Sequence, residues 1–573
     1  MLSVMLINAS GVDKKIDDWD SNATKQEYVE PTVVNYSGMG GNIAPVMAMP
    51  SPAIAPMKMS KTMVKRKIGL AVGGAKDSDN FIQNIKNGYI PKLKSITYEG
   101  VFYDHYFKSN GSDCKELFCP SYSLALSSNI YTNKDEYYIS VGLDSGVDVS
   151  KFKRDKLNLV VVLDVSGSMS SGFNTYYYDG KHSHKKIKSK MQVANETIVN
   201  MLKHLKDDDR LAIVLFDNRA YRVKPFRSVK TTDMKAISKH ILDIKSMGGT
   251  NWSAGYKAAL EYFDGVSKDG YENRIIFITD AMPNMGELKK DRLFGMSKSA
   301  AKRGIHTTFL GVGVDFNANL VDYVSKVKGA NYYSVHSAKE FAKRLDNEFD
   351  YMVTPLVYNL KLALDSKDFE IDSVYGVPNA KKATSELISI NTLFASSSSD
   401  DGNKGGVILV KLKKIHNGKK LSLKVSYKDK HNKSYSNKKD IEFDIKSGYE
   451  GSAIQKAIVL SRYVTLMQNW ILDARAGCND KLDYIHQKPI HIMQRCMVYP
   501  PQNPYIGHIK TWERKSCKLL VSAGYKKIFH IFKNYFKSQM KQLGDKSLKK
   551  ELEVLDMLTK DNLDLIDDYN NIR

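Results

Sequence analysis

The 573-residue sequence lacks the features that mark membrane and exported proteins. No run of about 18 apolar residues occurs, so we expect no membrane-spanning helix. The apolar start, Met1 to Asn8, has no basic region before it and is short for a signal peptide. We therefore predict an intracellular, cytoplasmic protein.

Cysteine is scarce, with five residues in the whole chain. Their positions show no regular pairing pattern, so they do not indicate a disulfide framework. Cys114 and Cys119 lie close together, but no second Cys or His pair follows at the spacing of a zinc site. We predict ordinary thiols and a reducing compartment.

Motifs of several enzyme classes are also missing. The sequence has no His-Glu-x-x-His, no Gly-x-Ser-x-Gly and no Walker lysine. We therefore predict that the protein is not an enzyme, and we assign no catalytic residue. A Mg²⁺-assisted hydrolase stays open as an alternative, because a bound Mg²⁺ can assist hydrolysis.

The net charge of +23 raises the question of a nucleic-acid partner. Between residues 451 and 550 the chain carries 18 Lys and Arg against 5 Asp and Glu, a net of +13. Lysines dispersed over solvated helices explain this excess more simply than a phosphate-binding face does. Binding of nucleic acid or another polyanion through residues 451–550 is the second alternative.

The most informative stretch ends in the motif Asp164-x-Ser166-x-Ser168. Five apolar residues, 159–163, precede it without alternation, which predicts a strand buried on both faces of a parallel sheet. Open α/β sheets bind ligands beyond the carboxyl ends of their strands. One carboxylate and two hydroxyls at that position are hard oxygen ligands, suited to Mg²⁺, or to Mn²⁺ or Ca²⁺, and not to Zn²⁺.

Two later stretches repeat this placement of oxygen ligands. Thr250 lies on a Gly-Gly turn ahead of a helical pattern, and Asp280 ends a second apolar strand that begins at Arg274. The three stretches together resemble the metal-ion-dependent adhesion site of von Willebrand factor A (VWA) domains, in the same chain order. Over about residues 67–475 the sequence is similar to a multidomain group of VWA proteins.

The resemblance implies a role for each of these side chains. Ser166 and Ser168 would bind the ion directly, Thr250 directly or through water, and Asp164 and Asp280 through coordinating waters. Mg²⁺ held in this way keeps a coordination position for the Asp or Glu of a protein partner. We therefore predict a metal-dependent adhesion or scaffold protein.

A Tyr- and Lys-rich segment, residues 171–184, follows the serine motif directly. It flanks the predicted opening of the metal site, and its basic character favours an acidic ligand. We expect it to determine partner specificity, through Tyr176, Tyr177, Tyr178 and Lys181.

Composition and periodicity divide the chain into five parts. The fold class we predict is α/β: a doubly wound, mostly parallel, Rossmann-like sheet inserted in or followed by an antiparallel β-sandwich, with a helical C-terminal region. Insertion requires that strands near 122–147 pair with strands after 355. The expected parts are a disordered segment (1–65), a mixed helix and strand module that belongs to the sandwich if the insertion holds (66–155), the VWA domain (156–350), the sandwich (351–448) and the helical region (449–573).

Overall fold

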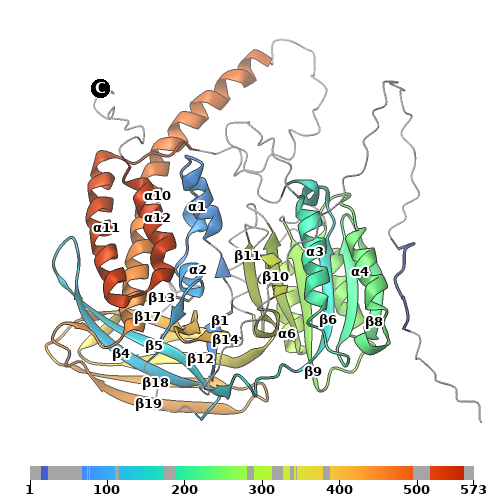
Figure 1. The fold of residues 1–573 in the computed structure, drawn as a ribbon, viewed down its shortest axis with the longest axis horizontal. Coiled ribbons are helices and arrows are strands. Elements are labelled where there is room, and N and C mark those ends of the chain that lie inside the picture. Colours follow the sequence, from blue (N-terminus) through green and yellow to red (C-terminus); the bar gives the residue numbers. More distant parts are fainter. Residues whose placement is uncertain are drawn as a thin grey trace, which may run out of the picture.

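The computed structural model shows two large sheets side by side, each with helices packed against it (Figure 1). The seven-stranded sheet has helices on both faces, and the ten-stranded sheet is antiparallel. The structure describes residues 15–23, 67–73, 75–76, 78–109, 115–172, 188–280, 290–312, 327–335, 341–342, 345–346, 348–377, 387–493 and 517–560.

The seven-stranded sheet has the order β2-β11-β10-β9-β6-β7-β8. All its neighbouring strands are parallel except β7 and β8, which are antiparallel. This agrees with the predicted mostly parallel sheet. Its strands are β2 (Ala75–Lys76), β6 (Lys156–Asp164), β7 (Arg210–Phe216), β8 (Ala220–Ser228), β9 (Tyr271–Thr279), β10 (Ile305–Val312) and β11 (Asn331–Val335).

The central strand β6 is buried on both faces, which explains its uninterrupted apolar run. Leu159, Val161 and Leu163 face one cluster, while Val160 and Val162 face another. Helices on opposite sides of the sheet complete the two clusters, as expected for a doubly wound fold. On the first side lie α3 (Lys190–Leu202), α4 (Met234–Leu242) and α9 (Phe349–Met352), and on the second α5 (Trp252–Tyr262) and α6 (Lys290–Lys302).

The ten-stranded sheet combines strands from both sides of the seven-stranded domain in the sequence. β1 pairs with β5 on one edge and with β14 on the other, and β5 also pairs with β17. The predicted pairing, and with it the insertion of the parallel-sheet domain, is confirmed. The strands are β1 (Lys67–Val72), β4 (Cys119–Ser128), β5 (Asp135–Asp148), β12 (Pro355–Asp365), β13 (Phe369–Tyr375), β14 (Leu387–Ser396), β17 (Val407–Lys414), β18 (Lys420–Lys428), β19 (Ser434–Glu442) and β20 (Gly448–Tyr449).

The predicted β-sandwich takes the form of one continuous sheet, because β1 joins the strands on its two edges. Side chains from eight of its strands share a single buried apolar cluster. A small three-stranded sheet adjoins it, made of β3 (Tyr106–Phe107), β15 (Ser398–Ser399) and β16 (Gly402–Lys404).

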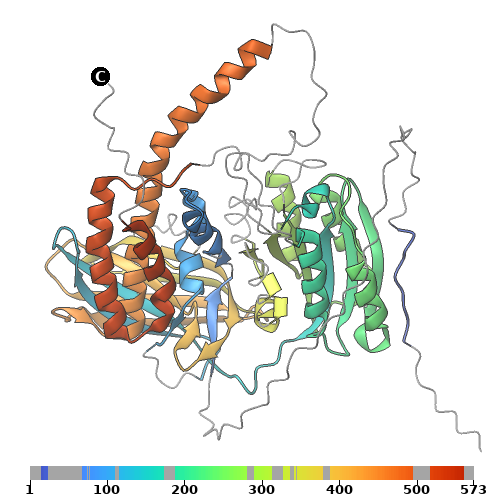
Figure 2. The same cartoon turned by 45° about the horizontal axis from the view of Figure 1, so that its top comes forward.

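A helical layer covers one face of the ten-stranded sheet (Figure 2). It combines N-terminal with C-terminal helices around a fourth apolar cluster. Phe529, Phe532 and Phe536 are fully buried in it, as predicted from their helical spacing. The helices of this layer are α1 (Asp79–Lys86), α2 (Tyr98–Tyr103), α10 (Ser452–Met493), α11 (Ala523–Leu543) and α12 (Lys549–Leu558). The short 3₁₀ turns found anywhere among the described residues are η1 (Leu93–Ser95), η2 (Gly167–Ser170), η3 (Val229–Thr231) and η7 (Lys546–Leu548).

Residues 15–23 pack against the inserted domain, beside β8 and α4 (Figure 2). The Ile16 N–H donates to the Thr231 carbonyl, and the Asp20 N–H donates to the Val223 carbonyl. The prediction of disorder over 1–65 is therefore wrong for these nine residues. The segment contacts residues some 200 positions away in the sequence, and local composition cannot reveal such long-range contacts. The rest of the predicted disordered segment lies outside the described residues.

Two cysteines correct another prediction. Cys119 and Cys517 are each disulfide-bonded, so they are not the free thiols we predicted. Disulfides persist mainly in oxidising compartments, and the cysteines therefore no longer support an intracellular location. Among the described helices, none has the length and apolar character needed to cross a bilayer.

Candidate metal centre

The predicted metal ligands gather at one edge of the seven-stranded sheet. Strands β6, β7 and β9 are neighbours and run in the same direction, so their carboxyl ends meet there. Asp164 is the last residue of β6, and Asp280 directly follows β9. Both carboxylates are fully buried.

Hydrogen bonds join four of the five predicted ligands into one cluster. The Ser166 N–H donates to Asp164 Oδ1 (2.8 Å), and Ser168 Oγ donates to Asp280 Oδ1 (2.7 Å). The two serine hydroxyls lie 3.1 Å apart. Thr279 Oγ1 donates to the other Asp164 oxygen (2.6 Å), so strand β9 is tied to the end of β6.

The fifth predicted ligand, Thr250, lies on a loop that is bonded to the serine turn. The Gly167 N–H donates to the Gly248 carbonyl (3.0 Å), and Thr250 itself is buried. Gly248 has φ +69°, and a Cβ at this position would lie 2.5 Å from Asp217 Oδ2. A glycine is therefore required to bring the Thr250 loop against the site.

The cluster brings several buried carboxylates close together. Burial and the neighbouring Asp280 carboxylate raise the pKa of Asp164, while hydrogen bonds from Ser166 and Thr279 oppose that rise. Asp217, at the end of β7, is also fully buried, and its Oδ2 has no hydrogen-bond partner in the described structure. A cation near these carboxylates would relieve this electrostatic strain.

Lys190 is a residue of the site that the sequence analysis missed. Its Nζ donates to Asp280 Oδ2 at 2.8 Å, and its side chain is 6% exposed. It opens helix α3, where a cation is unfavourable because the N-terminus carries the positive end of the helix dipole. A lysine directly after the N-cap, Ser189, was therefore a signal that a specific anion lies nearby.

The donor set fits a Mg²⁺-like ion. It combines buried carboxylates with hydroxyl groups, which are the hard oxygen ligands that Mg²⁺ prefers. Lys190 supplies one positive charge, whereas the carboxylates of Asp164 and Asp280 supply two negative charges. A divalent cation would therefore improve the charge balance. No group of three His, Cys, Asp or Glu side chains with metal-binding geometry occurs among the described residues, so the hydroxyls are essential to this fit.

The predicted specificity residues Tyr176, Tyr177, Tyr178 and Lys181 lie outside the described residues. The described residues that directly precede and follow 173–187 nevertheless lie beside the site. Gly172 pairs with Ser189, and the Lys190 N–H donates to the Ser171 carbonyl (2.9 Å). The backbone of Lys190 thus anchors the segment while its side chain holds Asp280.

Comparison with known families agrees with this geometry. Residues 159–283 match the model of the von Willebrand factor type A domain. This part of the chain is a VWA domain. The match contains all five predicted metal ligands.

Curated relatives share the VWA domain and little more of their length. Inter-alpha-trypsin inhibitor heavy chain H2 of Mus musculus is 26% identical over 213 residues, which are 36% of this chain and 20% of that protein. The uncharacterized protein YfbK of Escherichia coli K12 is 23% identical over 209 residues, 36% of this chain and 33% of YfbK. The chain thus spans between a fifth and a third of the length of these two relatives.

The von Willebrand factor type A protein from Catenulispora acidiphila aligns over 73% of this chain and 96% of its own, with a TM-score of 0.41 and 14% identity.

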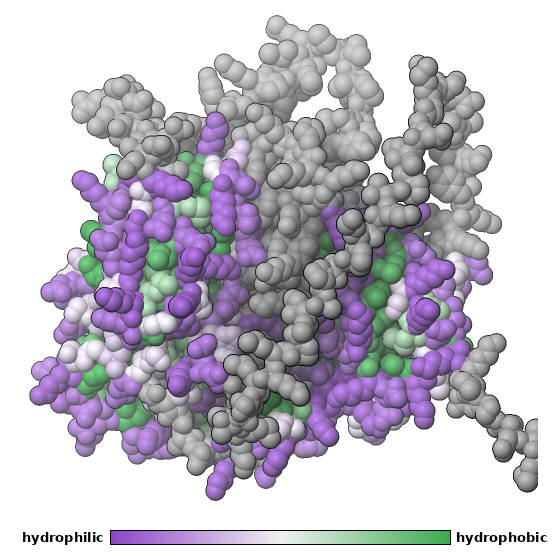
Figure 3. All heavy atoms as spheres, viewed as in Figure 1, coloured by the Kyte–Doolittle hydropathy of each residue, from purple (hydrophilic) through white to green (hydrophobic). Residues whose placement is uncertain are grey.

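The basic helical region uses several of its cations in the interior. Lys456 is buried and pairs with Asp545, and Arg462 pairs with Glu136 of β5 at 2.7 Å. Arg475 donates to the carbonyls of Ile90 and Pro91. On the face shown in Figure 3, hydrophilic side chains cover the helical layer and the other described parts of the surface alike. These internal pairings account for part of the positive charge of residues 451–550.

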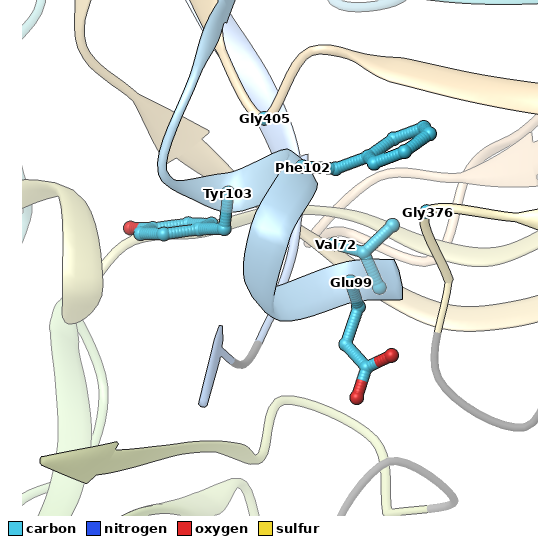
Figure 4. A pocket seen from close by; sticks show the side chains of 6 residues that line it. All are labelled: Val72, Glu99, Phe102, Tyr103, Gly376 and Gly405. Atoms are coloured by element: carbon cyan, nitrogen blue, oxygen red, sulfur yellow. The ribbon is translucent and has the colours of Figure 1, made fainter. Parts of the chain in front are cut away.

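A small cavity lies beside α2, away from the metal ligands. Its lining is Val72, Glu99, Phe102, Tyr103, Gly376 and Gly405 (Figure 4). Phe102 and Tyr103 point to opposite sides of the helix. The volume of about 10 Å³ is roughly that needed for one water molecule. We assign it no ligand.

Proposed function

We propose that the VWA domain binds a divalent cation, Mg²⁺ by preference, and through it an Asp or Glu side chain of a protein partner. The observation that carries the proposal is the cluster of Asp164, Ser166, Ser168 and Asp280, joined by hydrogen bonds at the ligand-binding edge of the sheet. Ser168 is half-buried and so lies at the border between the cluster and solvent.

The side chains have distinct tasks in this proposal. The hydroxyls of Ser166 and Ser168, now 3.1 Å apart, would turn their oxygens toward the ion. Asp164 and Asp280 would accept hydrogen bonds from its waters, and Lys190 would keep Asp280 in place. When bound, the ion supplies a coordination position that an acidic side chain of the partner completes. Few protein charges contact it directly, so the ion retains its attraction for an anion.

A pair of serine variants in one turn tests the metal site. Ser168→Ala removes a proposed ligand, whereas Ser170→Ala removes an exposed hydroxyl bonded only to the Gly167 carbonyl in the same turn. We expect Ser168→Ala to weaken Mg²⁺ binding at least tenfold in titration calorimetry, and Ser170→Ala to bind as the wild type does. Equal affinities for all three proteins would contradict the proposal.

Affinity purification from lysate then tests the partner. Proteins retained with Mg²⁺ should be lost with EDTA and lost again with Ser168→Ala. Partners that stay bound with EDTA and with Ser168→Ala, but are released as the salt concentration rises, would instead favour polyanion binding through residues 451–550. Mg²⁺-dependent turnover of a phosphoester or peptide would favour the hydrolase alternative.

A further inference from the structure

The nine residues from Lys15 to Ala23, here called the docking segment, meet a surface of matching chemistry on the VWA domain. The segment contains three acidic residues and one tryptophan, and 43 residues (24–66) separate it from β1. We call the surface the β8–α4 face. Its contacting residues are Val223, Lys224, Arg227, Thr231, Asp233 and His240.

A buried cation on this face is matched to a carboxylate of the segment. The Lys224 side chain is 0% exposed, and its Nζ lies 3.2 Å from Asp18 Oδ1. Burial lowers the pKa of Lys224, and Asp18 opposes that change. Arg227 Nε donates to the second Asp18 oxygen at 2.7 Å. Because a buried charge requires a counter-charge, the face is built to receive a carboxylate.

Two neighbouring residues of the segment contact a single histidine. Asp17 Oδ2 lies 2.8 Å from His240 Nε2, and the Trp19 ring stacks on the His240 ring with centroids 5.3 Å apart. Trp19 also packs against the apolar cluster of α3 and α4. The face therefore recognises an Asp-Asp-Trp sequence and not acidity alone.

Main-chain bonds add a contact typical of strand addition. β8 is the last strand of its sheet, and an edge strand presents unpaired backbone groups. The segment satisfies one of them, the Val223 carbonyl. At the turn after β8, Ile16 donates to the Thr231 carbonyl and accepts from the Asp233 N–H. All of these contacts come from the nine described residues 15–23, so a short peptide of that sequence carries them.

We propose that the docking segment of one copy of this chain binds the β8–α4 face of a second copy and so links molecules head to tail. Exchange of identical segments keeps every contact described above, so its cost lies in the entropy lost when two molecules associate and in the entropy of the connecting chain. A connection of 43 residues can extend to about 140–155 Å, which reaches the chain's own face or a neighbour's. The tether favours the chain's own face in dilute solution, and exchange increases with local concentration. This inference is independent of the metal site.

Two full-length variants that cannot dock in cis test the exchange. Asp18→Asn/Trp19→Ala weakens the segment, and Arg227→Ala/His240→Ala weakens the face at partly exposed side chains. Each variant alone should remain a monomer of 64.6 kDa in light scattering. Their mixture pairs one intact segment with one intact face, and we expect a 1:1 dimer at twice that mass.

A fluorescein-labelled peptide of residues 15–23 separates docking from exchange. It should bind the segment variant at least tenfold more tightly than it binds either the wild type, whose face is occupied, or the face variant. Peptide binding without a mixed dimer would restrict the segment to its own face and overturn the exchange. Absence of both would overturn the recognition of the segment as well. Unchanged thermal unfolding midpoints would confirm that the variants are folded.

Discussion

The two large sheets of this protein are assembled from the sequence in different ways. The VWA sheet takes all its strands except β2 from one continuous stretch, whereas the ten-stranded sheet combines strands that precede that stretch with strands that follow it. The VWA sheet therefore depends on contacts within one stretch, and its neighbour depends on contacts across the whole inserted domain. Substitutions at the junction should affect both sheets, and substitutions within one sheet should leave the other intact.

The junction offers the largest expected effect. Arg154, which precedes β6, donates to both oxygens of the buried Asp209 and to Asp350, and thus ties the beginning of the VWA domain to its end. Arg154→Ala leaves Asp209 buried without this cation, and we expect a loss of about 3–5 kcal/mol in the free energy of unfolding. Urea denaturation measures it.

Lys151→Ala is the control for this substitution. The Lys151 side chain is 80% exposed and pairs with Asp148 at the surface, so its removal should not change stability measurably. A similarly small effect of Arg154→Ala would show that this ion-pair network does not hold the beginning and the end of the VWA domain together.

A second test concerns the ten-stranded sheet alone. Burial alone would raise the pKa of Glu136 on β5, but hydrogen bonds from Asn129, Lys411, Arg462 and Tyr138 hold it at about 2. A folded-state pKa below the unfolded value of 4.5 stabilises the fold above that pH, by roughly 3 kcal/mol. This stabilisation is lost as the pH falls from about 4.5 toward 2.

Glu136→Gln should remove most of this pH-dependent stability. We expect the variant to be less stable than the wild type at pH 7, with the difference narrowing toward pH 3, in urea titrations at several pH values. The more exposed Glu370, paired with Lys413, is the matched control. Weaker Mg²⁺ binding by Glu136→Gln at neutral pH would break the proposed independence of the two sheets.

The smallest expected effect tests the metal site from within the VWA sheet. Gly248→Ala places a Cβ against Asp217 and imposes φ +69° on an alanine, so we expect a loss of about 1–3 kcal/mol and weaker Mg²⁺ binding. Gly304→Ala has a similar φ of +72° with no atom near the added Cβ. It should cost about 1 kcal/mol and leave Mg²⁺ affinity unchanged. Equal effects on metal affinity would show that crowding at Asp217 does not shape the Thr250 loop.

The apolar run of β6 and the residues after it gave the clearest predictions. A strand buried on both faces needs apolar residues without alternation, so its place in the sheet was predictable, and the ends of parallel neighbours then had to meet. Lys190 was not found, because its contact with Asp280 spans 90 residues, and its place at the start of a helix indicates a nearby anion without identifying it. The metal itself stays a prediction.

The sequence by itself determined the properties that depend on residues close together in the chain. These are the burial of β6 on both faces, the helical stripe of Phe529, Phe532 and Phe536, and the oxygen donors of the metal motif. Only the tertiary structure decided the pairings between distant residues. These are β1 between β5 and β14, Lys190 on Asp280, and the docking segment on Lys224. A local pattern records whether a side chain is buried, but the partner of a buried charge or strand edge depends on which surfaces the whole fold brings together.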